Sequence, residues 1–353
     1  MITRFAISGS AKNFDSQVEC PEISKFLKAL GMVETSVEDC EGLIFLNYNK
    51  KTYNEYKRLG KNMNNLVLIR IEPVSIFPSQ YRKSIEQKFK LIINPGKKLN
   101  ASQNKSDYVG WPYKYNLNPG VPKQNDPDLN YAIGNALANK VFNVESWNKK
   151  SNKIVLIAAN KVSPTSKSNY KIRRRIVKKM GQDEIDVYGD LWKSSISKKV
   201  YHRLSVCLFS LKSGYFPNFI EIYGNLFTKY KTIIGVIPNK HSIIQKYKFS
   251  LVIENSSDYC SEKLFDAIIN GSIPIYVGPK NDQIQLPNNL YYWSSGSINE
   301  IRNFISTLNS KQVSDMLKAM ENFIQSKIFS NYWTSEKVYF QISEKVYNFW
   351  NFK

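Results

Sequence analysis

The stretch "YKFSLVIENSSDYCSEKLFDAIINGSIPIYVGP", residues 247–279, decides the fold of the second half of the chain. "KFSLVIE" has the pattern of a buried strand, "SEKLFDAIIN" that of a helix ended by Gly271, and "IPIYVG" that of a second strand. Together they predict one βαβ unit, and such units bind ligands at the carboxyl ends of their strands. The polar residues of "ENSSDY" and "GPK" fall at those ends, so a binding site is predicted there.

The predicted helix begins near Ser261, and Glu262 and Lys263 follow at once. Free backbone N–H groups and the positive end of the helix dipole favour a phosphate at this position. Glu262 could accept hydrogen bonds from vicinal ribose hydroxyls, Lys263 could neutralise a phosphate, and Tyr259 could pack on or hydrogen-bond the ligand. A purely structural role, with Glu262 serving the helix dipole, is the alternative.

The length and composition indicate two folded domains. The chain has 353 residues, of which 42% are hydrophobic and 13% aromatic, enough for two cores of ordinary size. Apolar runs alternate with helix-like stretches in the first half, which is typical of an α/β domain with a parallel sheet. A Lys/Asn/Ser-rich stretch precedes the strand-like "KIVLIAAN", so we place the boundary near Lys149, between domains 1–149 and 150–353.

The net charge restricts the class of partner. Fifty Lys and Arg against 29 Asp and Glu give +21, so the surface should attract nucleic acid, anionic lipid or a phosphate-bearing substrate. A basic nucleic-acid-binding protein is one alternative, although the sequence has no recognisable reader motif and its aromatic residues follow core spacing. A solvated basic surface without a specific partner is another.

The cysteine and histidine content argues against a metal centre. The four cysteines form no close pairs, which is atypical of a zinc site or a disulfide framework, and two histidines supply little for a multi-histidine site. Residues 1–20 lack the apolar core of a secretion signal, and no apolar run is long enough to span a membrane. We expect a soluble cytoplasmic protein, with peripheral contact to the anionic inner membrane face left open.

The 247–279 stretch resembles the signature of the family-ten α-1,3/α-1,4-fucosyltransferases. That pattern runs Tyr-Lys-Phe, Glu-Asn-Ser, Asp/Gly-Tyr-x-Thr-Glu-Lys-Leu/Ile and small-x-x-Pro-x-Tyr/Val-x-Gly-Pro, and nearly every constrained position is filled here. The resemblance implies that five residues bind the donor: Glu254, Asn255, Tyr259, Glu262 and Lys263.

Weaker likeness extends toward the N-terminus. "NYKIRRRIVKKM", followed by "IDVYG", resembles the family's Arg-x-x-hydrophobic-aromatic helix and next strand. On that pairing Arg173 matches the phosphate-binding arginine, and Arg175 is the alternative because three arginines stand in a row. "LVLIRIEPVSIFP" resembles the Asn-Phe-Glu-Ser-Pro block and places Glu72 on the catalytic carboxylate. The local pattern agrees, since a lone acid at the end of an apolar strand suits a general base.

The resemblance implies a GT-B architecture, in which two facing Rossmann-like α/β domains hold the active site in the cleft between them. The N-terminal domain would bind the acceptor, with Tyr108, Trp111 and Tyr113 of the "SDYVGWPY" loop beside it, and the C-terminal domain with its helical tail would bind the donor. The implied reaction is inverting transfer of L-fucose from GDP-β-L-fucose to an oligosaccharide or glycolipid acceptor, on the 3- or 4-hydroxyl of an N-acetylglucosamine or glucose unit. No obligatory cofactor or metal is implied, because fixed cations would neutralise the leaving diphosphate.

The chain departs from the family pattern at several positions. Val74 stands where the family prefers Ser, Ser261 replaces the usual Thr, and only two residues separate Asn255 from Asp258. Residues 190–246 also form a longer segment than the family's equivalent. Two further alternatives therefore stay open: a transferase that uses a different GDP-sugar, and an inactive relative that binds glycans. The sequence does not indicate the oligomeric state.

Overall fold

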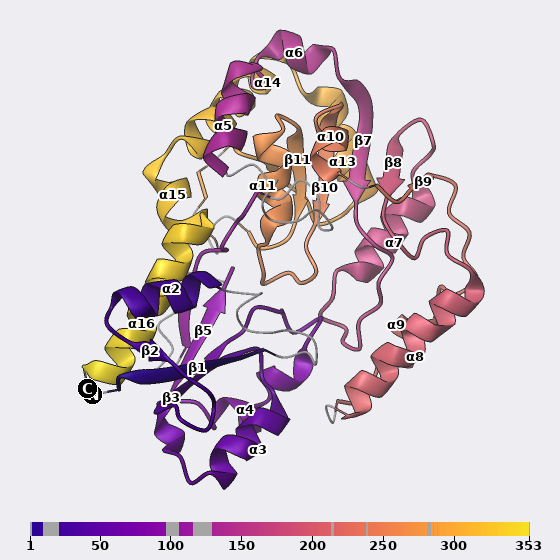
Figure 1. The fold of residues 1–353 in the computed structure, drawn as a ribbon. Helices are drawn as coiled ribbons and strands as arrows, with labels where there is room; N and C mark the ends of the chain where they lie inside the picture. The colour runs from indigo at the N-terminus through magenta and orange to yellow at the C-terminus, as the bar shows by residue number, and fades with distance from the viewer. Residues whose placement is uncertain are drawn as a thin grey trace. The chain divides into compact units, whose positions relative to one another are not determined.

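The computed structural model describes residues 2–9, 21–96, 106–115, 129–212, 215–237, 239–280, 284, 286–287 and 289–352. The chain divides into two compact units, shown in Figure 1. The first unit comprises Met1–Pro112 and Asn331–Lys353, and the second unit comprises Tyr113–Ser330.

The first unit is built on a six-stranded sheet in the order β2-β1-β3-β4-β5-β6, and every neighbouring pair of strands is parallel. The order reverses between β1 and β3, as in doubly wound α/β folds. Its elements are β1 (Arg4–Gly9), α2 (Pro21–Ala29), β2 (Val33–Glu34), β3 (Gly42–Leu46), α3 (Lys50–Arg58), η1 (Met63–Asn65), β4 (Leu66–Ile69), η2 (Pro78–Tyr81), α4 (Lys83–Glu86), β5 (Leu91–Pro95), β6 (Ser106–Val109) and α16 (Ser335–Asn351).

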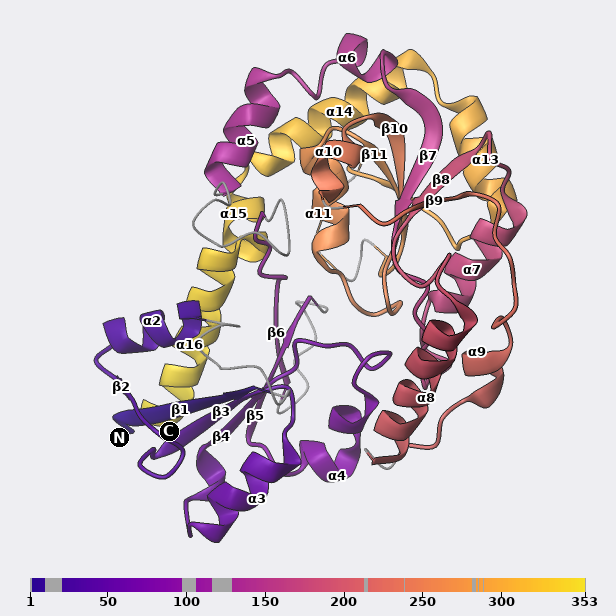
Figure 2. The same cartoon turned by 45° about the vertical axis from the view of Figure 1, so that its right-hand side comes forward.

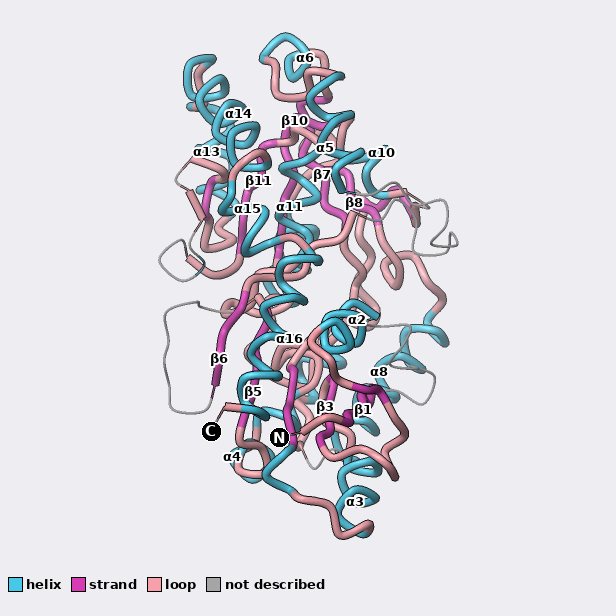
Figure 3. The backbone as a smooth tube through the Cα atoms, turned by 60° about the vertical axis from the view of Figure 1, so that its left-hand side comes forward, coloured by secondary structure: helices cyan, strands magenta, loops and turns pink. Residues whose placement is uncertain are grey.

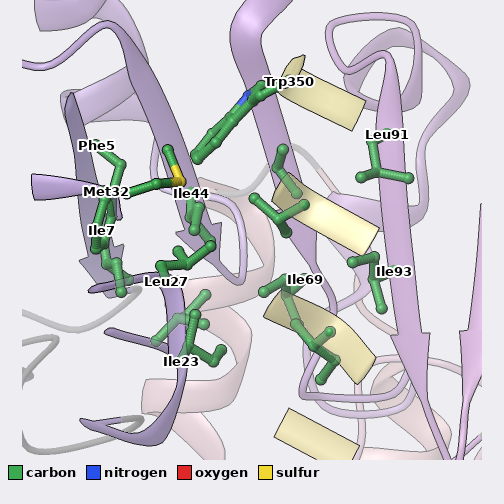
Figure 4. Packing of buried hydrophobic residues seen from close by; sticks show 14 of the residues in the cluster. Phe5, Ile7, Ile23, Leu27, Met32, Ile44, Ile69, Leu91, Ile93 and Trp350 are labelled. Carbon is green, nitrogen blue, oxygen red and sulfur yellow. The ribbon is translucent and has the colours of Figure 1, made fainter. Parts of the chain in front are cut away.

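Both faces of this sheet are covered, which explains why its strands are apolar on both sides. On one face Ile7, Ile44 and Ile69 belong to a core with α2 and α16, shown in Figure 4. On the other face Phe45 and Leu68 belong to a second core with side chains of α3 and the following loops. The alternation of Ile44 and Phe45 between the two cores is the two-residue period of a strand.

The C-terminal helix α16 belongs to the first unit, and Figure 3 shows it running along the sheet. Val338, Ile342, Val346 and Trp350 recur every four residues and are at most 4% exposed. Burial of each such side chain contributes about 1.5–3 kcal/mol, so this stripe fixes the helix firmly. The N-terminal segment lies beside the end of α16, since the Ile2 amide donates to Asn351 Oδ1 at 2.9 Å.

The compact units differ from the expected ranges 1–149 and 150–353 at both ends. Residues 129–148 contribute α5 and α6 to the second unit, where Trp147 donates through Nε1 to the Lys248 carbonyl at 3.1 Å. The polar stretch before residue 150 is therefore a turn between α6 and β7. The tail is helical, as the sequence predicts, but its apolar stripe packs on the first unit.

The second unit contains another parallel sheet of six strands, in the order β12-β11-β10-β7-β8-β9 (Figure 2). The predicted unit of strand, helix and parallel strand over residues 247–279 is confirmed as β10, α11 and β11. Its elements are α5 (Leu129–Ala138), α6 (Val144–Asn148), β7 (Ser151–Ile157), α7 (Tyr170–Lys179), β8 (Ile185–Tyr188), α8 (Ile196–Lys212), α9 (Phe219–Tyr223), β9 (Ile233–Gly235), α10 (Lys240–Ile244), β10 (Tyr247–Ile253), α11 (Glu262–Ile269), β11 (Ile273–Val277), β12 (Tyr292–Trp293), α13 (Ile298–Thr307), α14 (Ser310–Ile324) and α15 (Lys327–Trp333), of which the last crosses into the first unit.

Gly271 ends the α11 region as the sequence predicts. It has φ +60°, and a Cβ there would lie 2.3 Å from the Val141 carbonyl oxygen, so a side chain would be strained in conformation and space.

Within the described ranges, none of the helices combines the length and hydropathy needed to cross a lipid bilayer.

Candidate functional site

The strand order of the second unit places β7 beside β10 at its centre. The chain leaves β7 for β8 on one side and leaves β10 for β11 on the other, so the sheet has its topological switch point between them. Open α/β sheets bind ligands in the crevice at the carboxyl ends of the strands at such a point. The residues that follow β7 and β10 therefore form the candidate site.

Glu254, the first residue after β10, is the centre of this site and is fully buried. Its amide donates to the Val277 carbonyl at 2.9 Å, which continues the pairing with β11. Its carboxylate accepts from the Ser261 amide at 2.8 Å, from Ser261 Oγ at 2.7 Å and from Lys263 Nζ at 3.0 Å. A buried carboxylate is stable only with such partners, so Glu254 ties the end of β10 to the start of α11.

Lys263 also donates to Ser261 Oγ at 2.9 Å, while 23% of its side chain stays exposed. Burial lowers the pKa of Lys263, but the carboxylates of Glu254 and Glu262 outweigh that effect and raise the pKa above the ordinary lysine value. Burial raises the pKa of Glu262, but Lys263 and Lys240 outweigh it and hold the pKa below the ordinary value. Both residues are therefore charged at neutral pH.

Two small residues make this arrangement possible. Ser261 is the N-cap residue of α11, but its hydroxyl bonds Glu254 and Lys263 instead of capping the helix. The family's Thr would offer the same hydroxyl, so the Ser261 departure preserves the hydrogen-bonding group. Gly278, after β11, lies against Glu254, where an added Cβ would come within 2.9 Å of Glu254 Cγ.

The Arg173 guanidinium lies at the switch point and is 3% exposed. Nη1 donates to the Ala159 carbonyl beyond β7 at 2.8 Å, and Nη2 donates to the Ile253 carbonyl at the end of β10 at 3.2 Å. Its Nε has no hydrogen-bond partner among the described residues. Arg173 thus holds the ends of both central strands. To bind a phosphate directly, its guanidinium would have to give up these hydrogen bonds to the carbonyls.

The other two arginines of α7 point elsewhere. Arg174 is buried and pairs with Glu221. Arg175 is exposed and donates to the Gly296 carbonyl at 3.2 Å. Of the two candidates from the sequence, Arg173 therefore lies at the strand ends and Arg175 does not.

The loop after β10 holds the remaining predicted donor residues. The Asn169 amide donates to the Asn255 carbonyl at 3.1 Å, and Asn255 Oδ1 lies 3.5 Å from Arg173 Nη2, so this loop is joined to the start of α7. Asn255 is partly exposed, whereas Tyr259 is only 2% exposed. Tyr259 is therefore a packed residue in this structure, and its contact with a ligand stays a prediction.

A second polar cluster, on α10 and α11, was not singled out from the sequence. Asp266 is buried, accepts from Lys240 Nζ at 2.6 Å and from Tyr113 Oη at 3.3 Å, and lies 3.7 Å from His241 Nε2. Burial raises the pKa of Asp266 to about 6. Lys240 and Asp266 line a cavity of about 290 Å³ together with Glu262, Lys263 and the ends of β7 and β10. The sequence signal for this lysine was the Gly-x-x-x-x-Lys spacing from Gly235 to Lys240, which resembles a run of the same family.

Glu72 lies in the first unit, three residues beyond the end of β4, and is partly buried. Its amide donates to Asn47 Oδ1 at 3.0 Å, and its carbonyl accepts from Gln80 Nε2 at 2.9 Å and Tyr81 Oη at 3.0 Å. Asn47 follows β3 with φ +59°, and Gln80 is fully buried. The sequence did not indicate this network, which fixes the backbone of Glu72 at the carboxyl edge of the sheet.

The three predicted acceptor residues have different environments. Tyr108 pairs through its backbone with Asn94 on β5, and its side chain lies outside the described residues. Trp111 is partly exposed in the first unit. Tyr113 is fully buried in the second unit beside Phe265, with its hydroxyl on Asp266, so at this position it contributes packing.

Groups of three or more His, Cys, Asp or Glu side chains that could hold a metal ion are absent from the described part of the chain.

Comparison with known proteins finds a family match for the region around the candidate site in the second unit. The family model for the C-terminal part of glycosyltransferase family 10 (fucosyltransferase) matches residues 217–346. This range contains Glu254, Glu262 and Lys263, whereas Glu72 and Arg173 lie outside it.

The curated relatives match over short regions. An alpha-(1,4)-fucosyltransferase of Arabidopsis thaliana is 29% identical over 127 residues, which are 35% of this chain and 31% of the relative. The 4-galactosyl-N-acetylglucosaminide 3-alpha-L-fucosyltransferase 9 of Bos taurus is 38% identical over 68 residues, which are 19% of this chain and 18% of the relative. The chain thus spans less than a third of the length of these relatives.

Solved structures show the fold of nearly the whole chain. An alpha1,3-fucosyltransferase with GDP has a TM-score of 0.54 at 14% identity, over 99% of this chain and 91% of that one. Anabaena Alr3699/HepE, in complex with UDP and glucose, has a TM-score of 0.52 at 9% identity, over 98% of this chain and 100% of that one. With two parallel-sheet α/β units, the chain has the GT-B architecture predicted from the resemblance.

Proposed function

We propose that this chain, whose residues 217–346 match the family model of glycosyltransferase family 10 (fucosyltransferase), transfers L-fucose from GDP-β-L-fucose to a glycan hydroxyl with inversion. The observation that carries this proposal is the network of Glu254, Ser261 and Lys263 at the start of α11, within the residues that match the family. It places a fixed cation beside the amino end of a helix at a topological switch point, which is a site for a diphosphate.

The donor diphosphate would lie against Lys263 and the first turn of α11. An ammonium has three N–H donors, and Glu254 and Ser261 take two, so one can bind a phosphate oxygen. The free N–H groups of α11 add donors and positive potential. Because Glu254 holds Lys263 in place before the donor binds, little side-chain entropy is lost on binding.

Charged and polar groups near this helix would hold the rest of the donor. Glu262 is ionised and partly exposed, so its two oxygens can accept from vicinal ribose hydroxyls. Asn255 offers an amide at the edge of the same crevice. Arg173 would contribute positive charge below the diphosphate while it holds the ends of β7 and β10.

Glu72 would act as the general base in the first unit. As the acceptor oxygen attacks the anomeric carbon of fucose, its proton passes to the Glu72 carboxylate, and the bond from that carbon to the diphosphate oxygen breaks on the opposite face. GDP leaves with the bonding electrons, and the growing charge falls on oxygens next to Lys263 and α11. The acceptor would be an oligosaccharide or a glycolipid that offers the 3- or 4-hydroxyl of an N-acetylglucosamine or glucose unit.

This scheme requires no obligatory metal, because fixed cations supply the neutralisation. Transfer should therefore persist when EDTA is added to the purified protein, and complete loss of turnover would contradict this part of the proposal.

The test is incubation with GDP-fucose and a glycan acceptor array, followed by linkage analysis of the product. The proposal predicts fucose in α linkage on the 3- or 4-hydroxyl. A panel of sugar nucleotides run in parallel identifies the donor. Preferential turnover of another GDP-sugar would replace the fucosyl assignment, and binding of glycans without turnover of any donor would indicate the inactive relative.

A further inference from the structure

Helix α8 presents an unusual surface for a helix of a globular domain. The face that α8 buries against the rest of the second unit carries Arg203, Cys207 and Ser210. A separate stripe of apolar residues, at intervals of three and four, faces solvent: Tyr201 is 76% exposed, Leu204 47%, Leu208 57% and Leu211 50%. An apolar stripe at helical period normally faces a core or a partner, so this second stripe marks an interaction surface.

The apolar surface continues onto α9 and its neighbouring loops. Phe216 is 78% exposed, Ile220 85% and Phe227 75%. The Phe216 and Phe219 rings pack edge to face at 5.7 Å, so these two exposed side chains lie together. Figures 1 and 2 show α8 extending away from the strands of the second unit's sheet. We call the residues from Tyr201 to Phe227 that are exposed and apolar the α8–α9 surface.

A basic groove adjoins the α8–α9 surface. It is a cavity of about 600 Å³ along α7 whose cations are Lys167, Lys171, Arg174, Arg175, Lys178 and Lys179. Asn218, Glu221 and Asn225, from α9 and its flanks, form its other side, so α9 contributes residues both to the groove and to the apolar surface. Glu221 is the one acid among the described residues that line the groove, and it is paired with Arg174.

The surrounding sequence is strongly biased in charge. Residues 191–253 contain ten Lys and Arg and one acid, Glu221. Exposed leucine, isoleucine and phenylalanine beside a field of lysines is the composition that lies at a membrane interface, with apolar side chains below the headgroups and ammonium groups among them.

We infer that the α8–α9 surface and the adjoining basic groove dock the protein on an anionic lipid bilayer. Two other occupants fit less well. A second copy would bring its own basic groove toward the first in a two-fold contact, which places like charges together. Single-stranded nucleic acid uses aromatic platforms for stacking, and the aliphatic residues Leu204, Leu208 and Ile220 would gain nothing from bases.

The test is flotation of the full-length chain with two kinds of vesicle. One kind contains phosphatidylcholine alone, and the other contains about 30% phosphatidylglycerol, a fraction of anionic lipid on the order of that in natural membranes. Two variants separate the contributions. Lys171→Gln with Lys178→Gln removes two groove charges, and Leu208→Gln with Ile220→Gln removes two exposed apolar side chains. Lys311→Gln with Lys318→Gln on α14 is the matched charge control, and Tyr131→Gln on α5 is the apolar control; all three of these residues are exposed.

We expect binding only to anionic vesicles, and weaker binding as salt rises. The groove variant should bind roughly 30-fold more weakly, since each lysine near an anionic surface contributes about fivefold. The apolar variant should bind anionic vesicles at least about tenfold more weakly than the wild type. Both control variants should bind like the wild type. The inference is overturned by absent vesicle binding at low salt, by equal losses in the α14 control, by a stable dimer that the apolar variant dissociates, or by oligonucleotide binding that vesicles do not displace.

Discussion

The ion pair between Glu254 and Lys263 allows the binding role of the lysine to be separated from its structural role. Lys263→Met removes the cation and leaves the Glu254 carboxylate buried, with only the two donors of Ser261. Glu254→Gln combined with Lys263→Met removes both charges and keeps the side-chain volumes similar. The single variant should damage both stability and donor binding, whereas the double variant should regain most of the stability and still bind the donor weakly.

The magnitudes follow from the contacts. Removal of one partner of a buried ion pair costs about 3–5 kcal/mol, and the lower end applies because Lys263 is 23% exposed and Ser261 still donates twice. The double variant should recover at least about 2 kcal/mol of that loss. A charge-assisted hydrogen bond to phosphate contributes about 1.5–3 kcal/mol, so both variants should bind GDP roughly 10- to 150-fold more weakly.

Hydrogen exchange of the β10 and α11 amides reports the stability of this region, and titration calorimetry with GDP reports the affinity. Lys318→Met, at an exposed position on α14, is the matched control and should change neither quantity. If the double variant bound GDP as tightly as the wild type, Lys263 would be only the counterion of Glu254, and the proposed donor site would be refuted.

Three further predictions concern other residues. Glu72→Gln should lower kcat for transfer at least about 100-fold with GDP affinity unchanged. Glu38→Gln, at an exposed position, should change neither kcat nor GDP affinity. Full activity of the Glu72 variant would show that Glu72 is not the general base. Arg173→Met breaks the hydrogen bonds to the Ala159 and Ile253 carbonyls and should destabilise the second unit by about 3 kcal/mol. Arg175→Met should change the stability by less than about 0.5 kcal/mol. Equal losses of stability in the two variants, measured by hydrogen exchange, would contradict the structural role given to Arg173. Because the pKa of Asp266 is raised to about 6, the folded chain holds a proton that the unfolded chain releases near pH 4, so the free energy of unfolding should fall as pH rises from 4 to 6. That fall should reach up to about 3 kcal/mol and be absent in Asp266→Asn; identical pH profiles of urea unfolding would disprove it.

Local pattern was sufficient to predict β10, α11 and β11. The apolar runs, the acid and base at the helix start and Gly271 after its end each follow from short-range geometry. The same pattern could not show that Glu254 bonds Ser261 seven residues later, because that contact depends on the path of the loop between them. It also could not pair Lys240 with Asp266, which are 26 residues apart and meet only because α10 packs on α11.

The division of the chain was harder to predict for a physical reason. The apolar stripe of α16 shows that the tail is an amphipathic helix, but not which sheet buries it. Tyr113 illustrates the same limit, since its place in an acceptor-like motif gave no sign that Phe265 and Asp266 would enclose it. Around Glu72, the network of Asn47, Gln80 and Tyr81 joins the loops after β3 and β4 to η2, which a single sequence does not reveal.

The most direct measurement is a crystal structure of the chain soaked with GDP-fucose. The account predicts a diphosphate oxygen within about 3 Å of Lys263 Nζ and the backbone N–H groups that begin α11, with Glu254 still bonded to Ser261. A diphosphate bound away from α11, with Lys263 contacting only Glu254 and Ser261, would contradict it.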